Sequence, residues 1–123
     1  MKDRCYLVYA LAPKEASARE ANDRLNEYIA DRTRGIAVSH DHFVRSHGGF
    51  AVFYVRDDDE LARLEDPGPL AGWRLEAHPL TFSLTPAGFV AQAEFTLENY
   101  GGATLEELRA GEKQDPRYWW QAA

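Results

Sequence analysis

The chain has 123 residues, of which 45% are hydrophobic and 28% are charged. This composition is typical of one soluble domain that buries about two thirds of its unfolded surface. Twenty acidic residues against 14 lysines and arginines give a formal net charge of −6, which disfavours binding to nucleic-acid phosphates and to anionic membranes. Cys5 is the single cysteine, which excludes an internal disulfide and a zinc site with several thiolates, and a reducing cytoplasm is the expected compartment.

Residues 4–12 predict a strand that is covered on both faces, because apolar side chains occupy both of its parities. Lys2 and Arg4 precede this run, and its end resembles a signal-peptide cleavage site. Secretory signals need about 15 to 30 residues, so the segment is too short to be one. No apolar stretch approaches the roughly 18 residues of a membrane helix, and we therefore expect no membrane partner.

Ser17 and Glu20 form the Ser-x-x-Glu pattern of a capping box, which predicts that a helix begins here. Apolar residues then recur at helical spacing and form a stripe for packing. They are Ala18, Ala21, Leu25, Tyr28 and Ile29. Gly35 lies just beyond the expected end of this helix.

Residues 37–45 predict a second strand, and residues 50–55 predict a third that is again apolar at both parities. Between them, His47, Gly48 and Gly49 predict a turn. The two strands should therefore pair as a hairpin.

A short helix should follow the third strand. Asp57 to Asp59 provide its cap and acidic first turn, and the Pro67-Gly68-Pro69 segment ends it. Residues 73–84 predict a fourth strand, in which the inward parity changes at Pro79. A proline at that point indicates a bulge or kink on an edge strand.

The resulting order, β-α-β-β-α-β, is the ferredoxin-like pattern of α+β proteins. In that pattern the first and third strands are central, and these are the two strands that are apolar at both parities here. Two helices cover one face of such a sheet, so the other face needs a C-terminal extension or a second copy of the chain. We expect a single domain over residues 1–123, with a ferredoxin-like core at about 4–84 and a helical extension at about 85–123.

Thr85-Pro86 predicts the start of the first helix of the extension, and Gly101-Gly102 predicts its end. Thr104 and Glu107 form a second capping box. A last turn should begin at Asp115-Pro116 and carry an aromatic group that packs against this subunit or a partner, with ligand stacking as the alternative. The group consists of Tyr118, Trp119 and Trp120.

This order of elements, with cover needed on both sheet faces, resembles the dimeric α+β-barrel group of ferredoxin-like proteins, which includes small monooxygenases and isomerases. The phrases His40–Phe43 and Gly72–Leu80 are also similar to those of uncharacterised bacterial proteins. The resemblance covers about residues 4–84 and implies a homodimer whose two sheets face each other across a small cavity. It carries over no catalytic residue, because fold alone does not give function.

Another ferredoxin-like class, the RNA-recognition motif, is disfavoured. Gly49-Phe50-Ala51 resembles the centre of its third-strand signature, but that signature has Lys or Arg where Gly48 stands. It also has aromatic residues where Val52 and Val55 stand, so the stacking platform is missing. Because the acidic net charge opposes RNA binding further, we expect no nucleic-acid partner.

His40 and His42 are the strongest candidates for a functional site. Alternate residues of a strand share a face, so the two imidazoles should project together, about 6.6 Å apart along the backbone. They could act as a catalytic general acid or base, or share a divalent metal ion for which His78 is the best distant third ligand. Bringing His78 to the pair would require a dimer that joins opposite sheet edges. In the alternative interpretation, the pair is hydrogen-bonded or faces a partner.

Four further side chains could bind a ligand: Tyr9 and Tyr54 on the central strands, and Arg74 and His78 on the fourth strand. The tyrosines could offer phenolic hydrogen bonds, or they could be amphipathic core residues. Cys5 lies within an apolar strand and is expected to be an inert buried thiol.

Two functions remain open at this point. In one, the chain is a small cytoplasmic protein that binds or transforms a small molecule at a histidine-lined pocket of the sheet, with His40 or His42 as the catalytic group. In the other, it is a non-catalytic dimeric binding or assembly protein whose histidines are structural. No Ser-His-Asp arrangement, phosphate loop or dinucleotide fingerprint is present. The sequence therefore predicts no cofactor other than a possible divalent metal, and it does not decide whether the chain is an enzyme.

Overall fold

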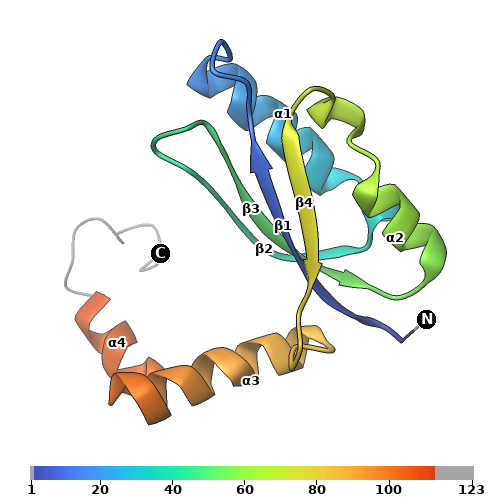
Figure 1. Ribbon diagram of the computed structural model, residues 1–123. Helices are drawn as coiled ribbons and strands as arrows, with labels where there is room; N and C mark the ends of the chain where they lie inside the picture. The colour runs from blue at the N-terminus through green and yellow to red at the C-terminus, as the bar shows by residue number, and fades with distance from the viewer. Residues whose placement is uncertain (1, 113–123) are drawn as a thin grey trace.

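The computed structural model describes residues 2–112 and shows an α+β fold with one four-stranded antiparallel sheet (Figure 1). The strands are β1 (Arg4–Leu11), β2 (Ile36–His42), β3 (Gly48–Val55) and β4 (Arg74–Pro79). Their spatial order is β2-β3-β1-β4. The prediction that the first and third strands are central, with the second and fourth at the edges, is confirmed.

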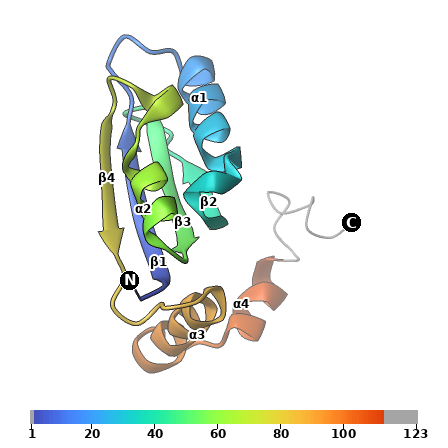
Figure 2. The same ribbon diagram turned by 90° about the vertical axis from the view of Figure 1, so that its right-hand side faces the viewer.

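Helices α1 (Ala18–Ala30) and α2 (Asp58–Glu65) cover one face of the sheet, as Figure 2 shows. Both begin where the sequence predicts. The Ser17 hydroxyl accepts a hydrogen bond of 3.1 Å from the first turn of α1, and the Asp57 carboxylate accepts one of 2.9 Å from the first turn of α2. The core lies between these helices and the sheet. It comprises Tyr6, Val8, Ala10, Leu25, Tyr28, Ala51, Phe53, Val55, Leu64 and Leu70.

The hairpin between β2 and β3 differs from the prediction at its turn. β2 ends at His42 and β3 begins at Gly48, so the turn precedes the two glycines that were predicted to form it. Both glycines lie inside the sheet because the neighbouring backbone is close. A Cβ atom on Gly48 would come within 2.1 Å of the Ala10 carbonyl oxygen. A Cβ atom on Gly49 would come equally close, 2.1 Å, to the Asp41 carbonyl oxygen.

β4 is shorter than predicted, since it ends at Pro79, which has no N–H to donate to a sheet. The chain then turns around the start of β1. There the Leu80 N–H donates to the Cys5 carbonyl oxygen, and the Cys5 N–H donates to the Ser83 carbonyl oxygen, both at 2.9 Å. These two bonds determine where the C-terminal extension leaves the sheet.

The sequence predicts a bulge or kink on the edge strand β4, whereas the structure has a bulge on the other edge strand, β2. Ala37 of β2 pairs with Phe53, and Ser39 pairs with Val52, so Val38 is an additional residue that faces no residue of β3. Phe53 belongs to the core beneath the helices. Beyond this bulge, the even-numbered residues of β2 therefore face the helices.

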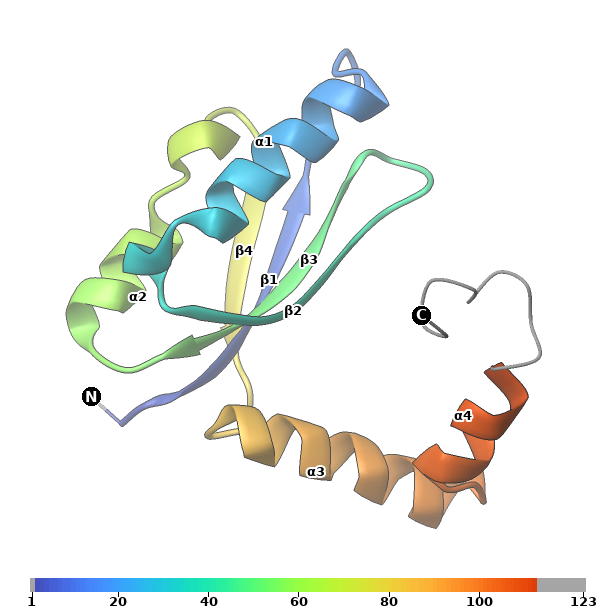
Figure 3. The same cartoon turned by 180° about the vertical axis from the view of Figure 1, so that it is seen from behind.

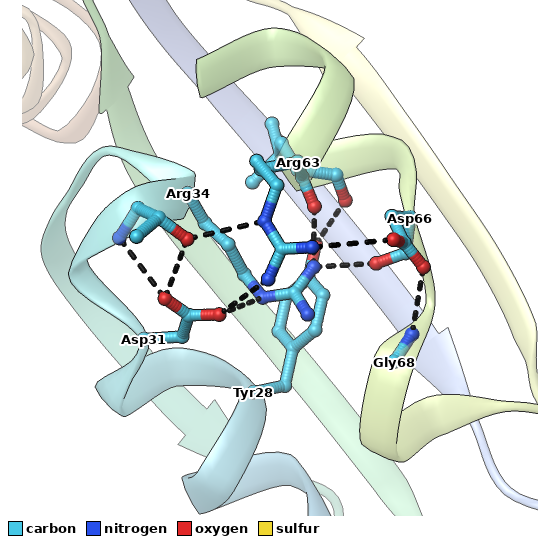
Figure 4. Close-up of polar contacts among 8 residues, drawn as sticks. Tyr28, Asp31, Arg34, Arg63, Asp66 and Gly68 are labelled. Atoms are coloured by element: carbon cyan, nitrogen blue, oxygen red, sulfur yellow. Dashed lines mark hydrogen bonds and ion pairs between the residues drawn. The ribbon is translucent and has the colours of Figure 1, made fainter. Parts of the chain in front are cut away.

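A buried arginine joins the two helices (Figure 4). Arg34 lies in the short turn η1 (Arg32–Arg34) after α1, and its side chain is 1% exposed. Its guanidinium donates to the backbone carbonyl oxygens of Arg63 and Asp66 at the C-terminal end of α2. The cation thus adds a donor at the end of the helix, where the Arg63 carbonyl oxygen also accepts the Asp66 N–H at 3.3 Å. A second short turn, η2 (Gly68–Leu70), follows.

The C-terminal extension forms an arm of α3 (Pro86–Thr96), the π-helical turn η3 (Leu97–Gly101) and α4 (Leu105–Glu112). The two predicted starts are confirmed, since Thr85 caps α3, and Thr104 and Glu107 exchange the hydrogen bonds of a capping box. In Figures 1 and 3 the arm lies beyond the end of the sheet at which β4 ends, and it leads away from that end. The predicted aromatic turn lies outside the described residues; it carries Tyr118, Trp119 and Trp120.

Candidate functional site

We call the face of the sheet opposite to α1 and α2 the open face. Strand register assigns its residues to rows that cross all four strands. One row comprises Glu76, Tyr9, Phe50 and Asp41. The next comprises His78, Leu7, Val52 and Ser39. In both rows the polar side chains stand on the edge strands, and the aliphatic and aromatic ones stand on the central strands. The open face is therefore an apolar strip with two polar borders.

The strip has an aromatic centre. The ring centroids of Tyr9 and Phe43 lie 5.7 Å apart, and those of Phe43 and Phe50 lie 6.4 Å apart. These separations are typical of favourable aromatic pairs. All three side chains are half-buried, so they form a continuous apolar floor that still has accessible surface.

Arg74, Glu76 and His78 alternate along β4 and form one polar border of the open face. The Glu76 carboxylate contacts both neighbours. One of its oxygens lies 3.2 Å from Arg74 Nε, and the other lies 3.6 Å from His78 Nε2. A carboxylate in this position can orient the imidazole for proton transfer, and the remaining N–H groups can donate to a polar ligand.

Tyr54, at one end of the open face, is engaged within the chain. Its hydroxyl donates a hydrogen bond to the Asp3 carboxylate. This bond raises the pKa of Tyr54 and lowers the pKa of Asp3, because it favours the neutral phenol and the ionised carboxylate. Among residues 2–112 the Tyr9 hydroxyl makes no such bond, so Tyr9 is the better placed of the two predicted tyrosines to bind a ligand.

His40 and His42 lie on the face that the helices cover. Their register partners are Ala51 and Gly49, and Ala51 belongs to the core. The two imidazoles share a face, as the strand alternation predicts. Their ring centroids are 5.6 Å apart, and the ring planes are inclined at 82°.

His42 is tied to α1 by its side chain. Its Nε2 atom lies 3.0 Å from Asn26 Oδ1, and its Nδ1 atom is buried without a hydrogen-bond partner. Asp41 does not orient the ring, because its carboxylate accepts the His42 backbone N–H at 2.8 Å. The contact with Asn26 thus joins an edge strand to the helix that lies over it.

The three histidines considered as metal ligands do not come together within one chain. His40 and His42 stand on β2 and face the helices, whereas His78 stands on the opposite edge strand and faces the open side. Between residues 2 and 112, no three His, Cys, Asp or Glu side chains form a set that could hold a metal ion.

Three residues of these two faces were not singled out from the sequence. Glu76 had a usable signal, since it shares the parity of Arg74 and His78 on one predicted strand. Phe43 and Asn26 had none, because their contacts depend on how the hairpin and α1 pack on the sheet.

The structure therefore divides the predicted site residues between two faces. The predicted ligand-binding residues lie on the open face; they are Tyr9, Tyr54, Arg74 and His78. The predicted catalytic residues, His40 and His42, lie on the helix-covered face. The chain matches no protein-family model, no curated protein and no solved structure.

Proposed function

We propose that the protein binds a small, partly apolar molecule on the open face of its sheet. One observation carries the proposal: the central strands present aromatic and aliphatic side chains on a face that no helix among residues 2–112 covers. Leaving such area in water is unfavourable by roughly 25 cal/mol per Å². Large apolar patches on soluble proteins are commonly binding surfaces.

The dimensions of the open face suggest the class of ligand. Neighbouring strands lie about 4.8 Å apart, so the two polar borders of a four-stranded sheet are separated by roughly 14 Å. That width suits a molecule of one or two rings whose body lies over Tyr9, Phe43 and Phe50. Arg74 and His78 would donate hydrogen bonds to a polar group at one end of it.

We further propose that two copies of the chain form a ferredoxin-like dimeric α+β barrel in the cytoplasm, with their open faces opposed. The antiparallel strand order β2-β3-β1-β4 supports this arrangement. Sheets that pack face to face lie about 10 Å apart, so side chains from both copies would surround the ligand. Opposed faces would also bury the apolar strip of each chain.

Proton transfer by His78 is a second candidate function. The 3.6 Å contact between His78 and Glu76 favours it, because a carboxylate can hold an imidazole in one orientation. For His40 and His42, the contact between His42 and Asn26 supports a structural role instead. Binding is our first proposal, since the His78–Glu76 pair by itself defines no reacting group.

Native mass spectrometry of the purified full chain tests the binding proposal by detecting a bound small molecule. Titration with 8-anilinonaphthalene-1-sulfonate, a probe with an aromatic body and an acceptor group, measures the binding affinity. Tyr9→Ser and His78→Ala should each weaken binding about tenfold, the loss expected for one hydrogen bond or ring contact. His40→Ala is the matched control on the other face and should leave binding unchanged. Binding that depends on His40 but not on His78, or no binding at all, would overturn the proposal.

A further inference from the structure

A cavity of about 650 Å³ lies at the edge of the sheet, where η1 joins the end of α1 to the start of β2 (Figure 3). Ala37, which lines it, pairs with Phe53 of the core, so this part of the wall belongs to the helix-covered side. The cavity shares no lining residue with the apolar strip of the open face. Volumes of about 300–1,000 Å³ are typical of small-molecule sites, so the cavity can hold a ligand of its own.

The wall of the cavity combines aliphatic side chains with two arginines. Its apolar residues are Ile29, Ala30, Ile36 and Ala37. The arginines are Arg32 and Arg56, and no acidic residue between residues 2 and 112 lines the cavity with them. A molecule with an aliphatic part and an anionic group would complement both parts of this wall.

The two arginines differ in how they are engaged. The Arg56 guanidinium donates to both carboxylate oxygens of Glu60, through Nε at 3.1 Å and through Nη2, while Nη1 takes no part in this pair. Arg32 is exposed, and its side chain forms no hydrogen bond or ion pair within the described part of the chain. Arg32 therefore gives the cavity a positive charge that no carboxylate of residues 2–112 balances.

The other arginines of this region hold the fold together. Arg34 donates to backbone carbonyl oxygens at the end of α2, and Arg63 contacts the carboxylates of Asp31 and Asp66. Arg32 makes no comparable contact, so its N–H groups are available to an external acceptor. Hydrogen bonds between a guanidinium and a carboxylate are roughly twice as strong as neutral ones.

We propose that this cavity binds a small aliphatic carboxylate, with its apolar chain against the aliphatic wall and its head group at Arg32. The wall selects the chain, because its apolar residues are all aliphatic, whereas the floor of the open face is aromatic. The charge selects the head group. Glu60, paired with Arg56, opposes a second negative charge, so a carboxylate fits better than a phosphate dianion.

Two other occupants fit the cavity less well. A peptide strand added to the free edge of β2 would meet the bulge at Val38, directly beside the cavity, and bulges disfavour such pairing. An anionic lipid surface would be repelled by the net charge of −6. Of the helices between residues 2 and 112, none has the length and apolar character to cross a bilayer.

Nuclear magnetic resonance titration of the full chain with octanoate tests the proposal. The backbone amide signals of Ala30, Gly35 and Ala37 should shift, since these residues line the cavity. Hexanoate should bind about tenfold more weakly, because two buried methylene groups are missing. Octylammonium has the same chain with the opposite charge, and it should bind at least about tenfold more weakly than octanoate.

Variants separate the charge from the apolar wall. Arg32→Gln should weaken octanoate binding at least about tenfold and leave 1-octanol binding unchanged. Arg45→Gln is the matched control, because Arg45 is also exposed but lies between β2 and β3, outside the cavity. Ile36→Ala should weaken the binding of octanoate and 1-octanol alike. The three variants should retain the far-ultraviolet circular dichroism of the wild type.

Several outcomes would overturn the inference. These are shifts confined to the open face, equal octanoate affinity of Arg32→Gln and the wild type, or acetate binding as tight as octanoate binding. Displacement of octanoate by a short peptide of alternating valine and glutamate, or by phosphatidylserine vesicles, would assign the cavity to a partner strand or a lipid surface instead. His78→Ala tests the open face and should leave this titration unchanged, so the inference and the proposed function can fail separately.

Discussion

The Arg34 guanidinium lies 4.2 Å from the centre of the Tyr28 ring, and both side chains reach the C-terminal end of α2. The Tyr28 hydroxyl donates to the Leu64 carbonyl oxygen there. Burial raises the pKa of Tyr28 to about 12, with a smaller opposing effect of Arg34, so the phenol is a neutral donor. Tyr28 and Arg34, which precede β2 in the chain, thereby bind the C-terminal end of α2, which follows β3. Helices α1 and α2 lie together on one face of the sheet.

Replacing the buried arginine should destabilise the fold. Arg34→Met should lower the free energy of unfolding by about 3 kcal/mol, because it removes the buried guanidinium that donates to the carbonyl oxygens of Arg63 and Asp66. Arg34→Lys should recover only part of this loss, since an ammonium group lacks the planar fork that reaches both Arg63 and Asp66. Urea denaturation measures the difference. Arg32→Met, at an exposed position of the same turn, is the control and should stay within about 0.5 kcal/mol of the wild type.

Alanine substitutions at two glycines distinguish the energetic cost of a strained backbone from the cost of crowding against Arg34. Gly68 and Gly72 both have positive φ angles, of 50° and 87°. A Cβ atom on Gly68 would lie 2.5 Å from Arg34 Nη2, whereas one on Gly72 would meet nothing within 4 Å. Gly72→Ala should therefore cost about 1 kcal/mol for the left-handed backbone alone, and Gly68→Ala should cost clearly more. Equal losses in urea denaturation would show that the Arg34 side chain moves aside freely.

Asp31 should make stability depend on acid pH. Its carboxylate accepts hydrogen bonds from the Thr33 hydroxyl at 2.6 Å and from the Thr33 N–H at 3.0 Å. These bonds, with a smaller effect of Arg63 and Arg34, hold the pKa of Asp31 below its usual 3.8. A carboxyl group with a lowered folded pKa adds stability above its unfolded value, and this stability is lost as the pH falls through the folded value.

Asp31→Asn should consequently be less stable than the wild type at pH 7 and should lose less stability on acidification below about pH 4. Urea midpoints measured at several pH values give both quantities. Thr33→Val, which removes one donor and keeps the carboxylate, should lie between the two. If the asparagine variant retains the wild-type slope, Asp31 is not the group responsible.

Cys5 should be protected from modification in the folded protein. Its side chain is fully buried, and burial raises the pKa of the thiol, so both access and the reactive thiolate are reduced. Ellman's reagent should react at least about 100-fold more slowly with the native chain than with the urea-unfolded chain, as expected when reaction requires opening of the strand. Rapid reaction under native conditions would contradict the burial of β1 at this position.

The contact between His42 and Asn26 should contribute to stability and not to ligand binding. His42→Ala and Asn26→Ala should each destabilise the protein, and their double-mutant cycle should give a coupling energy of about 0.5–1.5 kcal/mol, the net value of one hydrogen bond. His40→Ala with Asn26→Ala provides the control cycle and should show no coupling, because the 3.0 Å contact belongs to His42. Additive effects in the first cycle would remove the structural role assigned to this imidazole.

Local sequence chemistry predicted much of the fold. The helix starts at Ser17, Asp57 and Thr85 were readable because a cap hydroxyl or carboxylate bonds to a backbone N–H only three residues away. The prediction that Gly48 and Gly49 form the turn was wrong, because the role of these glycines depends on contacts between segments that are distant in sequence. Gly48 and Gly49 are required by the close approach of strands that are distant in sequence, and a turn uses the same residue type.

The candidate site shows the limit of this reasoning. Strand alternation was enough to predict that His40 and His42 share a face, and that Arg74 and His78 do. Strand alternation does not show which of the two faces of the sheet the helices cover. The bulge at Val38 then reverses the alternation along β2, so Ala37 and His40 face the same side although they differ in parity.

By itself, then, the sequence determined the order of the elements, their caps and the central position of β1 and β3, because these follow from hydrogen bonds within one turn and from apolar residues at alternate positions. Only the tertiary structure decided which side chains meet. The burial of Arg34, the contact of His42 with α1 and the grouping of Tyr9 with Glu76 and His78 all depend on long-range packing. Such packing is set by the whole chain, and the local pattern of residues along one strand or helix does not determine it.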